Sequence, residues 1–390
     1  MKEAVTMTLD EIRKEIDSID EQLLSLFERR MQAAVEVAKI KQKTGQPVFN
    51  AKREEEVLSH VGEAAGNLGS SAKIVFQTMM DVSRSLQHNI LGGGMPLKHL
   101  VDEAACEPLS GLHGALVACY GESGSYSHAA ATQMFQDARL SFCPQFSNVF
   151  DAIQSGDADY GVIPVENSTA GSVTEVYDLL IRHQFYIVSA VKMPIDHCLC
   201  APKGASLKTI QKIYSHPQAL RQCSSFVSSL GAEPIQYAST STAAKTVAQW
   251  NDITKAAIAS KEAAKQYGCV ILEDSIQNQK NNCTRFVAIS RKLHIEPSAN
   301  KISLVFSIPH TTGSLYRVLA NFAALGFNLT KIESRPIQES RFEYYFYLDF
   351  LGNAVGDDTL HLLRWLSEEL PYFAFLGNYP EQTSGANGEA

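Results

Sequence analysis

Residues 157–171 read DADYGVIPVENSTAG, an apolar run that passes at once into a turn of small polar residues. The run YGVIPV (160–165) has the length and continuous apolarity of a buried strand. We expect the turn after it, 166–172, to lead directly into a helix over 173–183. Open α/β sheets build ligand sites where a strand delivers polar side chains to the start of a helix. This stretch therefore predicts an α/β domain with a site at one edge of its sheet.

A second stretch, further upstream, has the same arrangement. LVACYG (116–121) is a predicted strand, and the Gly- and Ser-rich turn GESGSYSH (121–128) opens a helix. Free backbone N–H groups at such a turn can bind an anion, although a simple tight turn explains the composition equally well. Two turns of this kind in one α/β unit predict a ligand cleft at the strand ends.

Residues 196–265 form a further predicted α/β unit. It contains the turn SHPQ (215–218) and the hydroxyl run STSTAA (239–244), each of which a capped helix start also explains. The motif NNCTRF (281–286) then enters a predicted strand. Thr284 and Arg285 fall where this loop meets the strand, and a β-branched residue beside a surface ion pair is the alternative explanation for them.

The N-terminal region predicts a helix over 8–43, roughly 54 Å long. Its apolar residues follow a 3-4 spacing typical of a coiled-coil seam: Leu9, Ile12, Ile16, Ile19, Leu23 and Leu26. Arg30 continues this seam, which indicates either an interhelical ion pair or an anion site inside a helical bundle. Lys41, on the same helix face, favours the anion site. A small monomeric domain cannot cover so long a helix, so we expect it to pack against a second chain.

Shorter helices are predicted over 51–62 and 70–90. After residue 300 the predicted order is strand, helix, strand, strand, helix, strand, over 301–308, 313–325, 327–335, 342–350, 357–370 and 372–379. This βαββαβ order is the ferredoxin-like pattern. The expected domains are a helical domain (1–92), a linker (93–113), an α/β domain (114–293), a ferredoxin-like domain (300–380) and a disordered tail (381–390).

Composition excludes several classes of protein. With 390 residues, 45% hydrophobic, the chain is globular and has several domains. A net charge of −8 argues against binding nucleic acid, and no apolar run is long enough to span a membrane. The N-terminus lacks a signal peptide's apolar core, and the eight cysteines show no CxxC, which favours free thiols in the cytoplasm. No nucleotide-binding fingerprint or zinc spacing is present, so we expect no cofactor and no metal.

Residues 8–90 resemble the all-helical chorismate mutases, through IRKEIDSIDEQLLSLFERRMQAAVEVAKIK (12–41), the pair Arg53-Glu54 and SRSLQ (83–87). The resemblance implies three helices that interlock with a second chain. It places Arg13 and Arg30 on the two carboxylates of chorismate, and Lys41 and Gln87 as catalytic donors to the ether oxygen. The remaining implied contacts come from Asn50, Arg53, Glu54 and Ser83. Family members often carry an acidic residue where Asn50 stands.

Spacing supports the two-chain site. Arg13 and Arg30 are separated by about 25 Å along one helix, so one small dianion cannot contact both within one chain. We therefore expect each site to combine Arg13 of one chain with Arg30 of the other. The implied reaction, a Claisen rearrangement, needs a compact substrate conformer and donors to the oxygen that gains charge.

Residues 114–292 resemble prephenate dehydratase, through GSYSHAAA, DADYGVIPVENSTAG, DHC, YSHPQAL, STSTAA and NCTRF in that order. The resemblance implies two α/β lobes around a cleft, as in periplasmic solute-binding proteins. Thr284 would be the catalytic residue that protonates the departing hydroxyl, with Arg285 beside a substrate carboxylate. The other implied prephenate contacts are Ser125, Asn167, Ser215, Gln218, Ser239, Thr240, Ser241, Thr242 and Phe286. Glu122 stands where the family commonly has Pro.

The C-terminal segment resembles the ACT domain, a ligand-binding regulatory module, through TTGSL (311–315) and ESRP (333–336). The resemblance implies that phenylalanine binds between two chains. The implied contacts are Thr312, Gly313, Ser314, Leu315, Glu333, Ser334, Arg335 and Pro336. A dimerisation domain without a ligand is the alternative.

Together these features predict a bifunctional enzyme that converts chorismate to prephenate and prephenate to phenylpyruvate, with inhibition by phenylalanine. We expect a homodimer and leave pairing into a tetramer open. Two alternatives remain at this point. One is a dehydratase whose helical domain only dimerises, and the other is a non-catalytic binding or sensory protein that uses the two-lobed cleft.

Overall fold

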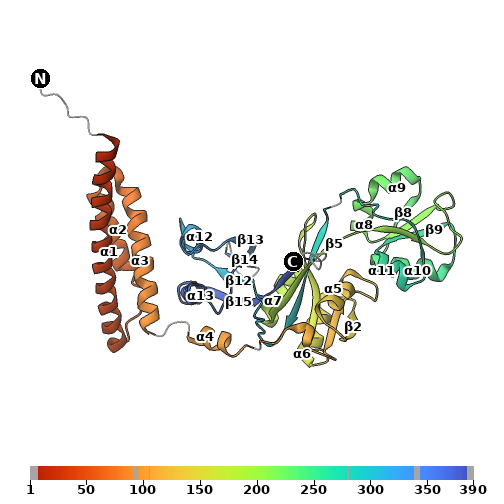
Figure 1. The fold of residues 1–390 in the computed structure, drawn as a ribbon, viewed down its shortest axis with the longest axis horizontal. Coiled ribbons are helices and arrows are strands. Elements are labelled where there is room, and N and C mark those ends of the chain that lie inside the picture. Colours follow the sequence, from red (N-terminus) through yellow and green to blue (C-terminus); the bar gives the residue numbers. More distant parts are fainter. Residues whose placement is uncertain (1–7, 92–94, 105, 280, 338–342, 384–390) are drawn as a thin grey trace, which may run out of the picture. The chain divides into compact units, whose positions relative to one another are not determined.

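The computed structural model of the chain describes residues 8–91, 95–104, 106–279, 281–337 and 343–383 (Figure 1). It divides into two compact units. The first contains the N-terminal helices together with the segments 308–325 and 357–371, and the second contains most of the remaining chain. No helix within the described residues is long and apolar enough to cross a membrane. The eight cysteines are all unpaired.

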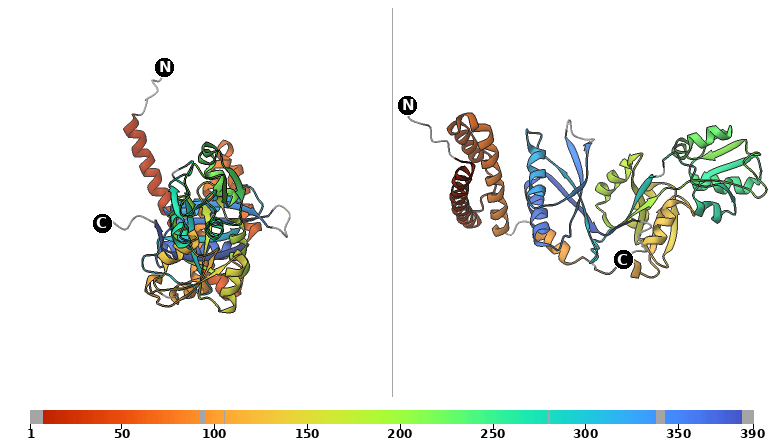
Figure 2. Two further views of the ribbon diagram at one scale, coloured as in Figure 1. Left: turned by 90° about the vertical axis from the view of Figure 1, so that its right-hand side faces the viewer. Right: turned by 45° about the horizontal axis from the view of Figure 1, so that its top comes forward.

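Three helices make up most of the first unit, α1 (Leu9–Thr44), α2 (Ala51–Ala64) and α3 (Gly69–Leu91). A capping box between Thr8 and Glu11 begins α1, and Gly45 ends it in the left-handed conformation. Figure 2 shows α1 and α3 side by side. The unit also holds α12 (Ser314–Ala324) and α13 (Asp357–Glu369), and a 3-10 turn, η1 (Gly66–Leu68), precedes α3.

The two faces of α1 differ in burial. Met31, Ala34 and Ala38 are buried, which fits the packing of α1 against α3. The predicted seam lies largely on the exposed side, where Ile16 is 50% and Leu23 57% exposed. The 3-4 pattern therefore describes an apolar surface that this chain alone does not cover.

The second unit contains two α/β lobes. The first lobe is a sheet of order β16-β5-β11-β3-β1-β2, with β4 on β3. Its strands are β1 (Leu116–Tyr120), β2 (Arg139–Cys143), β3 (Tyr160–Asn167), β4 (Gly171–Ser172), β5 (Tyr186–Pro194), β11 (Cys283–Ser290) and β16 (Glu381–Thr383). Its helices are α5 (Tyr126–Met134), α6 (Phe146–Ser155) and α7 (Thr174–His183). β11 lies between β3 and β5 and is antiparallel to both.

The second lobe is a sheet of order β10-β6-β9-β7-β8 (Figure 1, green). Its strands are β6 (Cys198–Ala201), β7 (Lys212–Ser215), β8 (Glu233–Gln236), β9 (Lys255–Ala259) and β10 (Val270–Glu273). Its helices are α8 (Pro217–Gln222), α9 (Ser224–Leu230), α10 (Thr240–Trp250) and α11 (Lys261–Gln266). The chain passes between the lobes after β5 and again after β10, which confirms the predicted two-lobed class.

A four-stranded antiparallel sheet of order β13-β14-β12-β15 completes the second unit. Its strands are β12 (Lys301–Ser307), β13 (Leu329–Pro336), β14 (Tyr344–Leu351) and β15 (Tyr372–Tyr379). This strand order, with the βαββαβ sequence of elements, is ferredoxin-like as predicted. The sheet shares a hydrophobic core with the first lobe, in which the rings of Tyr177 and Tyr347 lie 4.6 Å apart.

Two predicted boundaries need correction. The predicted linker 93–113 contains α4 (Met95–Asp102) and the 3-10 turn η2 (Leu109–Gly111). The predicted disordered tail begins with β16, which adds a parallel strand to β5 and therefore belongs to the first lobe. Residues 93, 94, 105 and 384–390 of these segments lie outside the described residues, as does residue 342 of the predicted strand 342–350.

Candidate active sites

A cluster of polar side chains lies where α1, α2 and α3 meet. The guanidinium of Arg30 donates to Oγ of Ser83 at 2.9 Å and to the carbonyl oxygen of Met79 at 3.0 Å. The ammonium of Lys41 donates to the carbonyl oxygen of Val48 at 2.6 Å. These acceptors are neutral, so the hydrogen bonds themselves supply no negative charge to either cation. Burial lowers the pKa of Arg30 and of Lys41, while Glu54 acts in the opposite direction on each.

Arg84 anchors Glu54 in this cluster. Its guanidinium binds the carboxylates of Glu54 and, at 2.6 Å, of Asp81, and its Nε lies 2.9 Å from Glu369 of α13. The side chain of Arg84 is only 8% exposed. Arg84 was not predicted from the sequence, although its spacing of three residues from Asp81 on a helix was a usable signal.

The other residues predicted for this site are placed differently. Gln87 donates to the carbonyl oxygen of Ser83 at 3.3 Å and is buried beside the cluster. Asn50 caps α2, because its Oδ1 accepts from the backbone N–H of Arg53 at 3.1 Å. The side chain of Arg53 is 71% exposed and lies 3.4 Å from Glu56. Arg13 is 66% exposed beside Asp10, so this chain does not bring it to Arg30.

A second cluster centres on Asn167 at the end of β3. Its Oδ1 accepts hydrogen bonds from Oγ1 of Thr169 at 2.7 Å and from the backbone N–H groups of Thr169 and Ala170, both at 3.0 Å. Three donors on one oxygen fix the orientation of the amide. Nδ2 therefore points the other way and donates to Oγ1 of Thr284 at 2.9 Å and to Oδ1 of Asn282 at 2.8 Å.

The second lobe extends this cluster. Nε2 of Gln222 donates to Oγ1 of Thr169 at 3.1 Å, and Oε1 of Gln222 lies 3.2 Å from Nε2 of His197. Burial lowers the pKa of His197, which favours the neutral ring. A chain of hydrogen bonds thus runs from His197 to Thr284. Gln222 and His197 were missed, although Gln222 follows Gln218 by four residues on α8.

A cavity of about 310 Å³ lies beside this series of hydrogen bonds. Its lining residues come from both lobes and from the segment that joins them: Thr169, Ala170, Gln218, Arg221, Gln222, Gln277, Asn278, Gln279 and Asn282. Amide groups dominate, and Arg221 supplies a positive charge. Thr284 does not line the cavity itself but bonds to Asn167, whose other partners Thr169 and Asn282 do. The cavity can hold a small polar anion.

Several predicted hydroxyls have local structural partners. Ser125 caps α5 and Ser239 caps α10, where Oγ of Ser239 also lies 2.7 Å from Oγ1 of Thr242. Ser241 donates to the carbonyl oxygen of Ser123 at 2.7 Å, which joins the two lobes. Ser215 is fully buried and donates to the carbonyl oxygen of Ile258 at 2.7 Å. Thr240 is the first residue of α10 and is half-buried.

The structure places Arg285 and Phe286 away from the cavity. Arg285 leaves the face of β11 opposite to Thr284, and its guanidinium lies 2.6 Å from Asp349 of the ferredoxin-like sheet. Phe286 is 3% exposed and packs in the hydrophobic core of the first lobe. Neither side chain lines the cavity described above. Strand alternation explains the position of Arg285, because adjacent residues of a strand face opposite sides of the sheet.

The predicted effector residues fall in two segments. Gly313 begins α12 at φ +80°, and Oγ1 of Thr311 lies 2.7 Å from Oγ of the buried Ser314. Thr312 is exposed and Leu315 half-buried. In the other segment, on β13, Ser334 and Pro336 are exposed.

The two charged residues of the β13 segment make contacts to the first lobe. Glu333 accepts from the hydroxyl of Ser172, and Arg335 lies 3.2 Å from Asp178. Within the described residues, no group of three or more His, Cys, Asp and Glu side chains is placed to hold a metal ion.

Comparison with known proteins identifies both domains. Family models match residues 12–88 as chorismate mutase type II and residues 117–294 as prephenate dehydratase. The Escherichia coli (strain K12) bifunctional chorismate mutase/prephenate dehydratase is 34% identical over 381 residues, covering 95% of this chain and 96% of its own length.

Solved structures align with about two thirds of this chain. Prephenate dehydratase from Arthrobacter aurescens, in complex with L-Phe, aligns with a TM-score of 0.63 and 29% identity over 68% of this chain and 90% of that chain. GqqA, described as a novel type of quorum quenching acylase, aligns with the same TM-score and identity over 68% and 98% of the two chains. Because the match to the bifunctional enzyme spans both catalytic domains, the chain belongs to the chorismate mutase/prephenate dehydratase family and carries both activities.

Proposed function

We propose that Thr284 delivers the proton that departs with the hydroxyl group of prephenate. The observation that carries this role is the fixed polarity of Asn167. Since Nδ2 of Asn167 donates to Oγ1 of Thr284, one lone pair of that oxygen is occupied and the O–H proton is directed elsewhere. The hydroxyl is thereby oriented as a donor, although a threonine hydroxyl is a weak acid.

The reaction balances with this single donor. The bond from the ring to its carboxylate breaks and releases CO₂, and the freed electron pair makes the ring aromatic. The bond from the ring to the hydroxyl breaks at the same time, and the departing oxygen takes a proton through Thr284, which solvent replaces. Arg221 and the amides around the cavity supply the charge and the donors that hold the dianionic substrate.

Substitution of Thr284 tests this role. Thr284→Ser keeps a hydroxyl, and we expect dehydratase kcat within about tenfold of the native value. Thr284→Val keeps the shape without the proton, and we expect a loss of at least about a hundredfold. Mutase activity of the same preparations serves as the control for folding. Near-native dehydratase activity in Thr284→Val would refute the proposal.

For the mutase, the proposed site is the cluster of Arg30, Lys41, Glu54, Ser83 and Gln87. Arg30 binds a carboxylate of chorismate, and Lys41 and Gln87 stabilise the charge that develops on the ether oxygen. Arg13 of a second chain completes the site. The exposed seam of α1 supports the dimer, because pairing with a second copy would bury Ile16, Leu23 and their neighbours.

For the C-terminal segment, the proposed function is that of an ACT domain that binds phenylalanine and inhibits the dehydratase. Three observations support it: the ferredoxin-like strand order, the left-handed Gly313 at the start of α12, and the L-Phe complex of the Arthrobacter aurescens relative. Calorimetry with phenylalanine, together with dehydratase assays, tests this role. Absence of both heat and inhibition would exclude it. A cytoplasmic location also stays a prediction, to be checked by fractionation of cells.

A further inference from the structure

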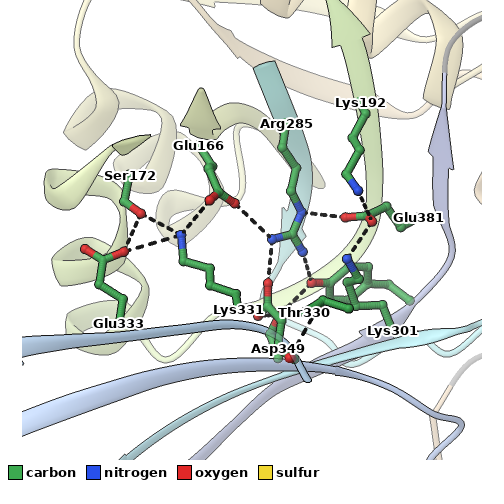
Figure 3. A network of polar contacts seen from close by, with 12 residues as sticks. Glu166, Ser172, Lys192, Arg285, Lys301, Thr330, Lys331, Glu333, Asp349 and Glu381 are labelled. Carbon is green, nitrogen blue, oxygen red and sulfur yellow. Dashed lines mark hydrogen bonds and ion pairs between the residues drawn. The ribbon is translucent and has the colours of Figure 1, made fainter. Parts of the chain in front are cut away.

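A charged network joins the ferredoxin-like sheet to the two strands that carry Asn167 and Thr284 (Figure 3). On the β11 side, the guanidinium of Arg285 lies 2.6 Å from Asp349 and donates to the hydroxyl of Tyr379 at 2.5 Å. Its Nε lies 2.7 Å from Glu381. Arg285, Asp349 and Tyr379 are each at most 5% exposed, so these contacts are made out of water.

On the β3 side, the equivalent contact is made by Lys331. Its ammonium lies 3.3 Å from the carboxylate of Glu166, the residue before Asn167, and also bonds to the hydroxyl of Ser172 at 2.5 Å. Glu333, one of the proposed effector residues, lies 3.4 Å from Lys331.

The register of the two sheets aligns these contacts. On the first lobe, Arg285 of β11 is paired with Glu166 of β3, and the next pair along is Thr284 with Asn167. On the ferredoxin-like sheet, Lys331 of β13 is paired with Asp349 of β14. The two cross-strand pairs therefore face each other so that Arg285 meets Asp349 and Lys331 meets Glu166. Displacing one of the two sheets would move Glu166 and Arg285, and with them the adjacent catalytic pair.

We propose that Glu166, Arg285, Lys331 and Asp349 form a positioning quartet through which the ferredoxin-like sheet sets the hydrogen bond between Asn167 and Thr284. None of the four is among the residues that line the cavity of about 310 Å³. This inference rests on the proposed roles of Asn167 and Thr284. It also gives phenylalanine a route to the dehydratase site, because Glu333 contacts Lys331 directly.

The test uses the full chain with Lys331→Met, with Asp349→Asn and with both. Each single change should lower dehydratase kcat about tenfold by misplacing the Thr284 hydroxyl, with KM changed less than about twofold. Mutase activity should be unchanged. Since both changes disturb the same hydrogen bond, the double variant should lose little more than either single one. If phenylalanine inhibits the native dehydratase, the concentration that gives half-maximal inhibition should be several times higher in both single variants.

The control is Lys192→Met, which removes a charge 2.8 Å from Glu381 at a side chain that is 43% exposed and lies outside the quartet. It should keep native dehydratase kcat. Native kcat in the single variants, or losses that multiply in the double variant, would overturn the quartet. If Asp349→Asn also loses mutase activity, Tyr379→Phe is used in its place, because this variant removes one hydrogen-bond acceptor of Arg285 and leaves every charge intact. A native dehydratase kcat in Tyr379→Phe would then contradict the proposal. Dehydratase activity retained in Thr284→Val would instead refute the role of Thr284 as proton donor. Failure of the quartet and failure of the proposed proton donor therefore give different results.

Discussion

The amide of Asn167 donates a hydrogen bond of 2.9 Å to the hydroxyl of Thr284, across two neighbouring strands of the first lobe. Three donors on the opposite oxygen of Asn167 leave it no alternative orientation. The arrangement assigns the roles of donor and acceptor before any substrate enters. The proposed dehydratase site is therefore preorganised by its own hydrogen bonds.

Reversing that polarity should stop the dehydratase. In Asn167→Asp a carboxylate oxygen replaces Nδ2 and accepts the Thr284 proton, so the hydroxyl no longer points to substrate. We expect dehydratase kcat to fall by about a hundredfold or more, with the mutase unaffected. Steady-state assays of both activities on one preparation measure this. A dehydratase that tolerates the carboxylate would contradict the assigned polarity.

Mixing two inactive mutases should restore activity. Arg13→Ala and Arg30→Ala each remove one half of every site if a site uses one residue from each chain. In a mixed dimer, one site loses both arginines and the other keeps both. After unfolding and refolding an equal mixture, about one quarter of native mutase activity should return. Recovery of none would show that each site lies within one chain.

Acid should remove the contribution of Glu381 to stability. Burial acts to raise the pKa of Glu381, but Arg285 and hydrogen bonds from Lys192 and Lys301 outweigh it, so the pKa falls below 4.5. A carboxyl whose pKa is lowered by folding stabilises the native state above its unfolded pKa and loses this effect as pH falls through the folded one.

Comparison with Glu381→Gln isolates this effect. The variant should unfold at lower urea than the native chain at pH 7, and the difference should be constant down to about pH 5 and shrink below it. Mutase activity confirms that the helical domain is intact. A difference that grows on acidification would contradict the sign.

Gly377 should tolerate no side chain. Its φ is +142°, and a Cβ built there would lie 2.1 Å from the carbonyl oxygen of Ile187, where β15 packs on β5. We expect Gly377→Ala to destabilise the second unit by about 2 kcal/mol or more. Gly231→Ala is the matched control, since Gly231 also has positive φ but nothing within 4 Å. Its cost should be about 1 kcal/mol, from backbone strain alone. Equal urea midpoints for the two variants would exclude the clash.

Local patterns in the sequence predict most of the elements. The capped helix from Thr8 to Gly45, the strand YGVIPV and the βαββαβ order all follow from side-chain period and turn residues, which depend on near neighbours. The proposed catalytic pair, Asn167 and Thr284, was predicted from motifs that lie at strand ends. These features need no knowledge of what packs on each face.

The contacts of Arg285 and Glu381 could not be predicted in that way. A strand residue's partner depends on which sheet covers its face, and the sheet covering Arg285 comes from residues 64 and 94 positions later in the chain. Glu381 follows Pro380 in a polar C-terminal stretch, so composition indicated disorder, whereas pairing of β16 with β5 and three nearby cations order it. The contacts of both residues depend on long-range packing.

One chain carries a chorismate mutase domain and a prephenate dehydratase domain, so prephenate is the product of one activity and the substrate of the other. The most direct measurement follows chorismate, prephenate and phenylpyruvate together over time in the native chain and in Thr284→Val. The native chain should convert chorismate to phenylpyruvate, and the variant should consume chorismate at the native rate while prephenate accumulates. Phenylpyruvate formed by the variant at the native rate, or chorismate left unconsumed by it, would contradict this assignment of the two steps.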